Sequence, residues 1–144
     1  MRLVRVGRAV WDVVAITDGK GGSVLTELDD IDPSYYHAET MRVLIEQYVP
    51  RNGPPVHNPL RCRPLGDDIF EFKAGPETGP KLRVLWFYDA GDPIERRRIV
   101  CTHSFLKKTK KTPPAEKARA VRLRGEYLEA KGLGALEAPP VKKE

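Results

Sequence analysis

The segment IFEFKAGPETGPKLRVLWFYDAGDPIERRRIVCTHSFL, residues 69–106, contains three runs of residues that favour β-strands. The runs are Ile69–Lys73, Leu82–Tyr88 and Arg97–Leu106. The middle run is apolar on both faces, which is typical of a strand in the middle of a sheet. Asp, Gly and Pro between the second and third runs favour a tight turn, so these two runs are expected to form a hairpin. Chain order therefore predicts a meander of antiparallel strands.

Polar and apolar side chains alternate in the first of these runs. Ile69, Glu71 and Lys73 fall on one face of the strand, and Phe70 and Phe72 fall on the other. The two faces of this strand are therefore expected to differ in polarity.

The N-terminal third contains a further strand signal. Trp11–Thr17 is rich in β-forming residues, and the glycine-rich segment Asp18–Gly22 favours a turn after it. Ser23–Leu28 is then expected to return as a second strand. Residues 1–32 would form a strand or hairpin extension of the domain.

Two helices are expected, each opened by a polar residue followed by proline. Asp32–Pro33 opens the first, which ends at Pro50 and Gly53 and is followed by a loop to Pro59. Apolar side chains recur in it at helical spacing, at Ala38, Met41, Ile45 and Tyr48. Thr112–Pro113 opens the second helix, which runs to about Ala130. The predicted fold class is α+β, with one N-terminal and one C-terminal helix packed on a small antiparallel sheet in a single domain (residues 1–135), followed by a polar tail (136–144).

Charge is distributed unevenly along the 144 residues, whose formal net charge is +5. From Glu95 to Arg124, eleven basic residues stand against two acids, so this segment carries +9 and the remainder of the chain −4. Asp18–Glu46 is locally acidic. Such a dense basic cluster repels itself unless anions neutralise it, so a polyanion such as nucleic acid is the expected partner.

Composition excludes several classes of protein. The hydrophobic share of 40% and the charged share of 31% are ordinary for a globular chain and exclude a disordered or collagen-like one. No apolar run approaches the roughly 20 residues of a membrane span, and charges interrupt the N-terminus where a secretory signal would be apolar. A cytoplasmic protein is expected. Cys62 and Cys101 lack the CxxC spacing, which argues against a zinc site. No metal and no cofactor are expected.

Three blocks in chain order resemble the RelE/ParE superfamily of toxins. They are RCRPLGDDIFEFK (61–73), KLRVLWFYDAG (81–91) and HSFLKKTKKTP (103–113), and an Ala/Arg-rich helix follows them. The last block is the most specific, and within the superfamily the blocks are most similar to the phage-derived, HigB-like branch. The resemblance covers residues 59–130. The segment 18–32 is longer than is usual there, and residues 50–59 replace a second helix.

The resemblance implies both a fold and a function. Members are compact α+β proteins whose helices pack on a small antiparallel sheet with a basic groove on its other face. Most are toxins of type II toxin–antitoxin modules that cleave mRNA, usually on the translating ribosome. It implies that this chain is an endoribonuclease that inhibits translation without a metal, with mRNA on the ribosome and a cognate antitoxin as partners.

Metal-free RNA cleavage requires a group that deprotonates a 2′-hydroxyl, a group that stabilises the transition-state charge, and a group that protonates the departing 5′-oxygen. Arg83 matches the arginine that opens a strand in the family pattern, and its planar guanidinium can bind two phosphate oxygens. Lys73 is a candidate proton acceptor or phosphate ligand, provided that neighbouring cations lower its pKa. His103 has a suitable ordinary pKa, but a packed histidine on one strand face with Cys101 and Phe105 is an equal alternative. Lys107, beside these groups, completes the catalytic candidates.

The remaining basic residues are expected to bind the RNA backbone. They are Lys108, Lys110 and Lys111 in the loop after the strand, and Arg119 and Arg122 on one face of the last helix. A solvated, purely structural face is the alternative for each of them. Asp67 and Asp68 are interpreted as turn residues, and no cluster of acids indicates a two-metal nuclease.

Two other functions stay open at this point. The same scaffold could be a ParE-like inhibitor that binds a protein such as DNA gyrase without catalysis. It could also be a phage-derived module that binds nucleic acid without cleaving it. The basic residues expected for RNA cleavage are present, which favours the nuclease.

Overall fold

The computed structural model describes residues 1–17, 22–31, 36–76, 80–89, 97–107 and 111–137. In chain order the elements are β1 (Leu3–Arg8), β2 (Trp11–Ile16), α1 (Val24–Ile31), α2 (Tyr36–Val43), the π-helical turn η1 (Leu44–Tyr48), α3 (Val49–Asn52), β3 (Cys62–Gly66), β4 (Ile69–Ala74), β5 (Lys81–Tyr88), β6 (Arg97–Lys107) and α4 (Pro114–Gly132). The predicted α+β class is confirmed.

One six-stranded sheet with the order β1-β2-β6-β5-β4-β3 forms the centre of the molecule. Strands β4 to β6 are an antiparallel meander, as predicted, and β5 lies in the middle of the sheet. Strand β3, which was not predicted, pairs with β4 at the edge. The sheet is mixed rather than purely antiparallel, because β2 pairs in parallel with β6. Residues 90–96, in the turn expected between β5 and β6, lie outside the described part of the chain.

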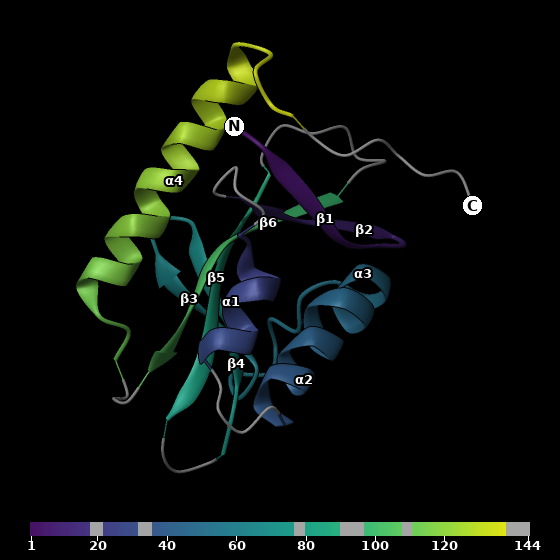
Figure 1. Cartoon of the computed structure of the whole chain (residues 1–144), viewed down its shortest axis with the longest axis vertical. Helices are drawn as coiled ribbons and strands as arrows, with labels where there is room; N and C mark the ends of the chain where they lie inside the picture. The colour runs from purple at the N-terminus through teal and green to yellow at the C-terminus, as the bar shows by residue number, and fades with distance from the viewer. Residues whose placement is uncertain (18–21, 32–35, 77–79, 90–96, 108–110, 138–144) are drawn as a thin grey trace.

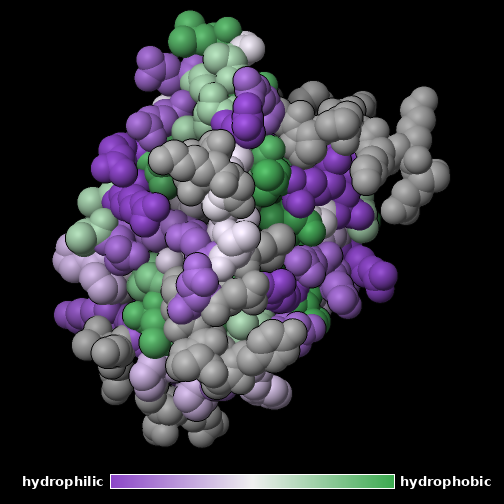
Figure 2. All heavy atoms as spheres, in the orientation of Figure 1, coloured by the Kyte–Doolittle hydropathy of each residue, from purple (hydrophilic) through white to green (hydrophobic). Residues whose placement is uncertain are grey.

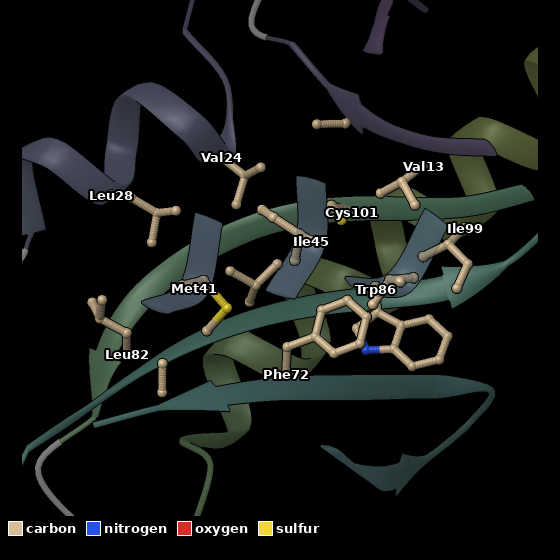
Figure 3. Close-up of a cluster of buried hydrophobic side chains, with 14 of the residues drawn as sticks. Val13, Val24, Leu28, Met41, Ile45, Phe72, Leu82, Trp86, Ile99 and Cys101 are labelled. Atoms are coloured by element: carbon tan, nitrogen blue, oxygen red, sulfur yellow. The ribbon is translucent and has the colours of Figure 1, made fainter. Parts of the chain in front are cut away.

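The two faces of the sheet are covered by different helices, with α1, α2 and α3 on one side and α4 on the other (Figure 1). The larger core lies under the first group of helices, where the rings of Phe72 and Trp86 stack with centroids 4.8 Å apart (Figure 3). The smaller core lies under α4 and contains Ile69, Leu85 and Tyr127. Strand β4 therefore divides its side chains between the faces as its alternation predicts.

The predicted N-terminal hairpin is wrong in its second strand. Ser23–Leu28 enters helix α1, and the partner of β2 is the preceding strand β1. Val24 and Leu28, four residues apart, are both fully buried against the sheet. Residues at this spacing lie on one face of a helix, which explains why the segment is a helix rather than a strand. The Thr26 hydroxyl accepts the Ser23 N–H at 2.9 Å, which stabilises the start of the helix. Residues 18–21 of the expected turn lie outside the described residues.

The first predicted helix ends just before Gly53, as expected, but Pro50 does not end it. Pro50 lies inside the helical segment, which ends at Asn52, and the expected opening at Asp32–Pro33 is outside the described residues. The π-helical turn η1 precedes Pro50 and accommodates its missing N–H and its ring. The wider turn shifts the buried face by one residue, so Val49 is buried and Tyr48, expected in the core, is 45% exposed.

Helix α4 begins as predicted but with a different cap. The N-cap residue is Pro113, without a side-chain cap, and the Thr112 hydroxyl donates to Glu71 on β4 instead. In the block before β4, Pro64–Gly66 belongs to strand β3. The turn is formed by Asp67 and Asp68, both with positive φ, as expected for turn residues.

We expect Gly125→Ala to stabilise the protein. Gly125 is an exposed residue inside α4, and a Cβ atom there would lie within 4 Å of no atom of the described structure. Alanine stabilises a helix interior by about 0.5–1 kcal/mol relative to glycine, so the free energy of unfolding should rise by that amount in a urea titration. Gly7→Ala is the opposite control, because its Cβ would lie 2.6 Å from the Glu46 carbonyl oxygen and should destabilise. A Gly125→Ala protein less stable than the wild type would contradict the open space beside Gly125 on α4.

Candidate functional site

Three predicted catalytic cations lie together on the sheet face that carries α4. Lys73 on β4 is directly opposite Arg83 on β5, and Arg83 is opposite Phe105 on β6. Lys107 follows Phe105 by two residues and so shares its face. The exposed fractions of Lys73, Arg83 and Lys107 are 8%, 4% and 2%. The structure therefore brings three separated stretches of sequence to one buried, positively charged cluster.

The Glu71 carboxylate lies among these cations and is fully buried. Its Oε1 accepts a hydrogen bond from Arg63 Nε at 3.0 Å and lies 3.3 Å from Arg83 Nη1. Its Oε2 accepts the Thr112 hydroxyl at 2.7 Å, which connects the segment before α4 to the cluster. Buried charges require such compensation. The role of Glu71 was not predicted from the sequence, although its place two residues before Lys73 on the same strand face was the available signal.

Arg83 retains hydrogen-bonding capacity that the rest of the described structure does not use. Its Nε and Nη1 atoms are buried and make no hydrogen bond to any described residue, the contact of Nη1 with Glu71 being an ion pair without hydrogen-bond geometry. A buried donor without an acceptor is costly, so a functional explanation is favoured. Charged donors of this kind are suited to the oxygens of a phosphate or a carboxylate.

The cluster lowers the pKa values of its own members. Burial, followed by the positive charge of Arg83, lowers the pKa of Lys107 to about 8. Burial and then Arg83 likewise lower the pKa of Lys73, and burial lowers that of Arg83. A lysine of pKa about 8 is neutral in about one molecule in ten at pH 7, which makes Lys107 a usable proton acceptor.

His103 lies on the same sheet face but is bonded to other groups. A β-bulge between Val84 and Trp86 turns His103 towards α4, whereas Cys101 lies in the opposite core, so the expectation that these two share a face is wrong. His103 is 1% exposed, with Nε2 3.1 Å from Glu116 Oε2 and Nδ1 3.1 Å from Thr102 Oγ1. Burial and then the charge of Arg119 lower its pKa, while Glu116 acts in the opposite direction.

The expected RNA-binding residues are partly described. Lys108 and Lys110 lie outside the described residues, and Lys111 is exposed just before α4 begins. Arg119 and Arg122 are exposed on α4, where hydrophilic side chains cover the helix on the face shown in Figure 2. Their charges lower the pKa of His103. Arg119 also lines a cavity of about 210 Å³ with Thr17.

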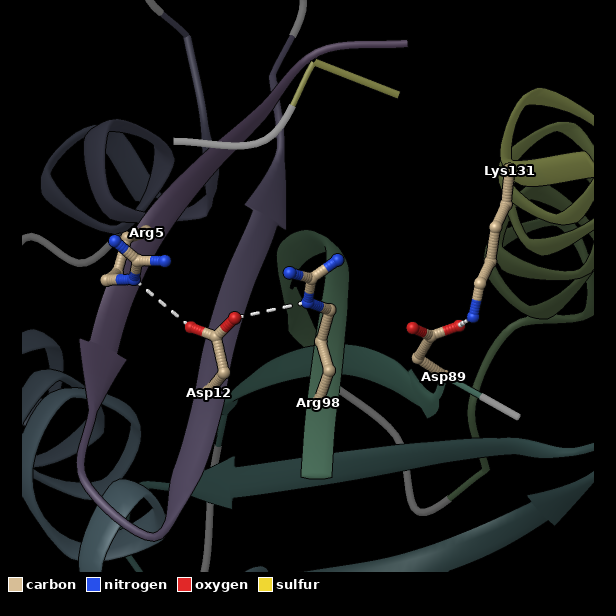
Figure 4. A network of polar contacts seen from close by, with 5 residues as sticks. All are labelled: Arg5, Asp12, Asp89, Arg98 and Lys131. Atoms are coloured by element: carbon tan, nitrogen blue, oxygen red, sulfur yellow. Dashed lines mark hydrogen bonds and ion pairs between the residues drawn. The ribbon is translucent and has the colours of Figure 1, made fainter. Parts of the chain in front are cut away.

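A separate polar network lies at the other end of this sheet face (Figure 4). The Asp12 carboxylate accepts hydrogen bonds from Arg5 and Arg98, both at 3.1 Å, and Lys131 near the end of α4 donates to Asp89 at 2.8 Å. The network joins β1, β2 and β6 and ties the end of β5 to α4. Each of its cations is bonded to a carboxylate, so we interpret it as structural.

The turn between β3 and β4 also forms ion pairs with α4. Asp67 lies 3.0 Å from Lys117 Nζ, and Asp68 lies 3.5 Å from Arg124 Nη2. These two residues therefore bind the helix in addition to forming a turn.

The fold and the site together define a class: an α+β protein with an open mixed sheet, one face of which carries a buried basic cluster beside a single helix. The model of the family described as "Phage derived protein Gp49-like (DUF891)" matches residues 26–124, and the chain belongs to this family. The match includes Lys73, Arg83, His103 and Lys107 and leaves out β1 and β2. The family is phage-derived and associated with toxin-like proteins.

Neither the curated proteins nor the solved structures contain a match to this chain. Among the residues that the structure describes, no helix is both long and apolar enough to cross a membrane. No group of three or more His, Cys, Asp and Glu side chains in the described ranges is placed to hold a metal ion.

Proposed function

We propose that this protein is the toxin of a type II toxin–antitoxin system, of the HigB-like kind, and cleaves mRNA on the ribosome without a metal. The single observation that carries the proposal is that Lys73 and Lys107 lie beside Arg83, whose Nε and Nη1 atoms make no hydrogen bond to any described residue. Membership in a toxin-like family supports the toxin role and an antitoxin partner. Cleavage of the mRNA would inhibit translation.

The proposed reaction is attack of a 2′-hydroxyl on the adjacent phosphorus. Lys107, in its neutral form, accepts the 2′-hydroxyl proton while the 2′-oxygen–phosphorus bond forms. Arg83 donates N–H groups to the phosphate oxygens, whose negative charge increases in the transition state. The phosphorus–5′-oxygen bond breaks, and the Lys73 ammonium protonates the departing oxygen. The products are a 2′,3′-cyclic phosphate and a 5′-hydroxyl.

Two further residues have positioning roles in this scheme. Glu71 holds Arg83 and Arg63 in place, and its contact with Thr112 connects the cluster to α4. His103 has both ring nitrogens engaged inside the protein, so it positions α4 through Glu116 rather than touching RNA. Arg63 is the most exposed cation bound to Glu71, with 40% of its side chain exposed, and is the first that an RNA backbone would meet. Because the catalytic cations are nearly covered, neighbouring side chains must move for the phosphate to reach them.

We expect the cleavage rate to rise with pH through about 8. The pKa of Lys107 lies below its ordinary value, so the fraction of the neutral base grows as pH rises to about 8 and then reaches a plateau. Single-turnover cleavage of ribosome-bound mRNA between pH 6 and 9.5 measures this profile. Lys107→Arg keeps the charge but does not titrate in this range, so the rising limb should disappear together with most of the activity. Retention of the limb in Lys107→Arg would assign the base to another group.

An inhibitor of a protein target is the second candidate function. The exposed Arg119 and Arg122 on α4 would fit an acidic protein surface as well as RNA. Growth arrest with intact transcripts would favour this function.

A further inference from the structure

A pocket of about 560 Å³ opens at the end of the sheet where β4 ends and β5 begins. It is lined by Asn58, Leu60, Arg61, Ala74, Pro76 and Lys81, among others. Its volume lies within the roughly 300–1,000 Å³ that is usual for sites of small molecules. None of these residues belongs to the site proposed above.

The pocket adjoins the basic cluster. Lys81 lies two residues before Arg83 on β5 and so shares its strand face, whereas Ala74 lines the pocket from the face opposite to Lys73. The Lys73 N–H donates to the Arg61 carbonyl at 2.8 Å. Lys81 is opposite Lys107 in the register of β5 and β6, and its positive charge contributes to the lowered pKa of Lys73. Through Lys81, a ligand in the pocket would reach the strand face that carries Arg83.

The cations of the pocket differ from those of the cluster in their ion pairs within the described ranges. The side chains of Arg61 and Lys81 form no ion pair with any residue in the described ranges, whereas Arg63 and Arg83 are held by Glu71. Arg61 is exposed and Lys81 is half-buried. An anionic ligand is the natural partner for two free cations on one pocket wall.

Asn58 contributes a hydrogen-bond donor of defined direction. Its Oδ1 accepts the Leu60 N–H at 3.1 Å, so the amide oxygen is occupied and the Nδ2 group is left for a ligand. Leu60 is 69% exposed and, with Ala74 and Pro76, gives the pocket an apolar wall. Two cations, an amide donor and an apolar wall are the groups that a phosphate, a base edge and a base face require.

We propose that this pocket binds the nucleotide next to the scissile phosphate, an inference that rests on the proposed RNA substrate. Arg61 and Lys81 bind its phosphate, and Leu60 packs on the face of its base. The Asn58 amide donates to a carbonyl oxygen or ring nitrogen at the edge of the base, so Asn58 is a specificity-determining residue.

Binding of a non-cleavable RNA tests the pocket separately from catalysis. The probe is a fluorescein-labelled, fully 2′-O-methylated hexanucleotide, whose affinity for the full-length protein is measured by anisotropy between 50 and 300 mM salt. Arg61→Gln and Lys81→Gln should each weaken binding about 3- to 10-fold and reduce the salt slope by about 0.7, the value for one phosphate contact on a single strand. Arg51→Gln, an exposed arginine on α3, is the matched control and should change neither quantity.

Asn58→Asp tests the base contact. It keeps the acceptor for the Leu60 N–H but replaces the donor with a second acceptor, so it should shift preference towards bases that present amino groups. Affinities for a set of 2′-O-methylated hexanucleotides that differ at one position measure this shift. An unchanged ranking of the four bases would contradict the assignment.

The outcomes separate this inference from the proposed function. If Arg61→Gln and Lys81→Gln bind the hexanucleotide as the wild type does, while Arg83→Ala abolishes cleavage, the pocket assignment fails and the nuclease stands. If the variants lose binding but the wild type cleaves no RNA, the pocket stands as a nucleotide site and the nuclease fails. If polyglutamate displaced the labelled hexanucleotide as effectively as unlabelled RNA does, the assignment of the pocket to a nucleotide would be wrong, and an acidic peptide would be the favoured ligand.

Discussion

Arg83→Ala should reduce RNA cleavage by at least about 10²- to 10³-fold, the loss seen when one preorganised donor to a transition-state anion is removed. The expectation rests on the position of Arg83 opposite Lys73 and on its buried Nε and Nη1 atoms, which have no hydrogen-bond partner in the described part of the chain. Induction of the wild type should arrest growth and create new mRNA 5′ ends. Both effects should disappear in the Arg83→Ala variant.

Two controls make this result specific. Arg51→Gln should leave cleavage unchanged, because Arg51 is exposed on α3, on the side of the sheet opposite α4. Equal thermal unfolding of Arg83→Ala and the wild type would exclude loss of fold as the cause. Arrest with intact transcripts would favour the inhibitor of a protein target, and no arrest would favour a binding module without catalysis.

Glu71→Ala should lower the free energy of unfolding by roughly 3–5 kcal/mol, since it leaves buried cations without their carboxylate. Glu71 is fully buried and bonded to Arg63, Arg83 and Thr112. A loss of this size is a large fraction of the stability of an ordinary domain. Urea titration followed by tryptophan fluorescence measures it, with Glu126→Gln on the exposed side of α4 as a control that should stay within about 0.5 kcal/mol.

A second substitution keeps this prediction testable if Glu71→Ala fails to fold. Lys107→Met removes one of the cations that repel one another, so combining it with Glu71→Ala should recover part of the lost stability. A Glu71→Ala protein within about 1 kcal/mol of the wild type would show that the carboxylate does not hold the cluster together.

The sheet meander and the last helix could be predicted from the sequence because their signals are local. Alternation in Ile69–Lys73, the apolar run of β5 and proline near the start of α4 are each read within a few residues. The pairing of β5 with β6 then follows from chain order. Arg83, Lys73 and Lys107 were found through a family resemblance carried by the same local blocks.

Features that depend on distant partners could not be predicted in this way. Strand β1 has an arginine at every third position, so its sequence does not predict a strand, and it is a strand only because it pairs with β2. The parallel pairing of β2 with β6 joins residues more than 80 positions apart. The π-helical turn before Pro50 and the bulge that turns His103 each shift a face by one residue. Glu71 was overlooked because its partners, Arg63, Arg83 and Thr112, come from three other segments.

The chemistry of the cleaved RNA ends tests the central proposal most directly. Attack by a 2′-hydroxyl under the control of Lys107 and Arg83 must leave a 5′-hydroxyl on one fragment and a 2′,3′-cyclic phosphate on the other. Ligation of RNA from induced cells to adaptors that require either a 5′-hydroxyl or a 5′-phosphate distinguishes the two ends at each new site. The account predicts 5′-hydroxyl ends that are absent from the Arg83→Ala strain. New 5′-phosphate ends at the same sites, unchanged by Arg83→Ala, would contradict it.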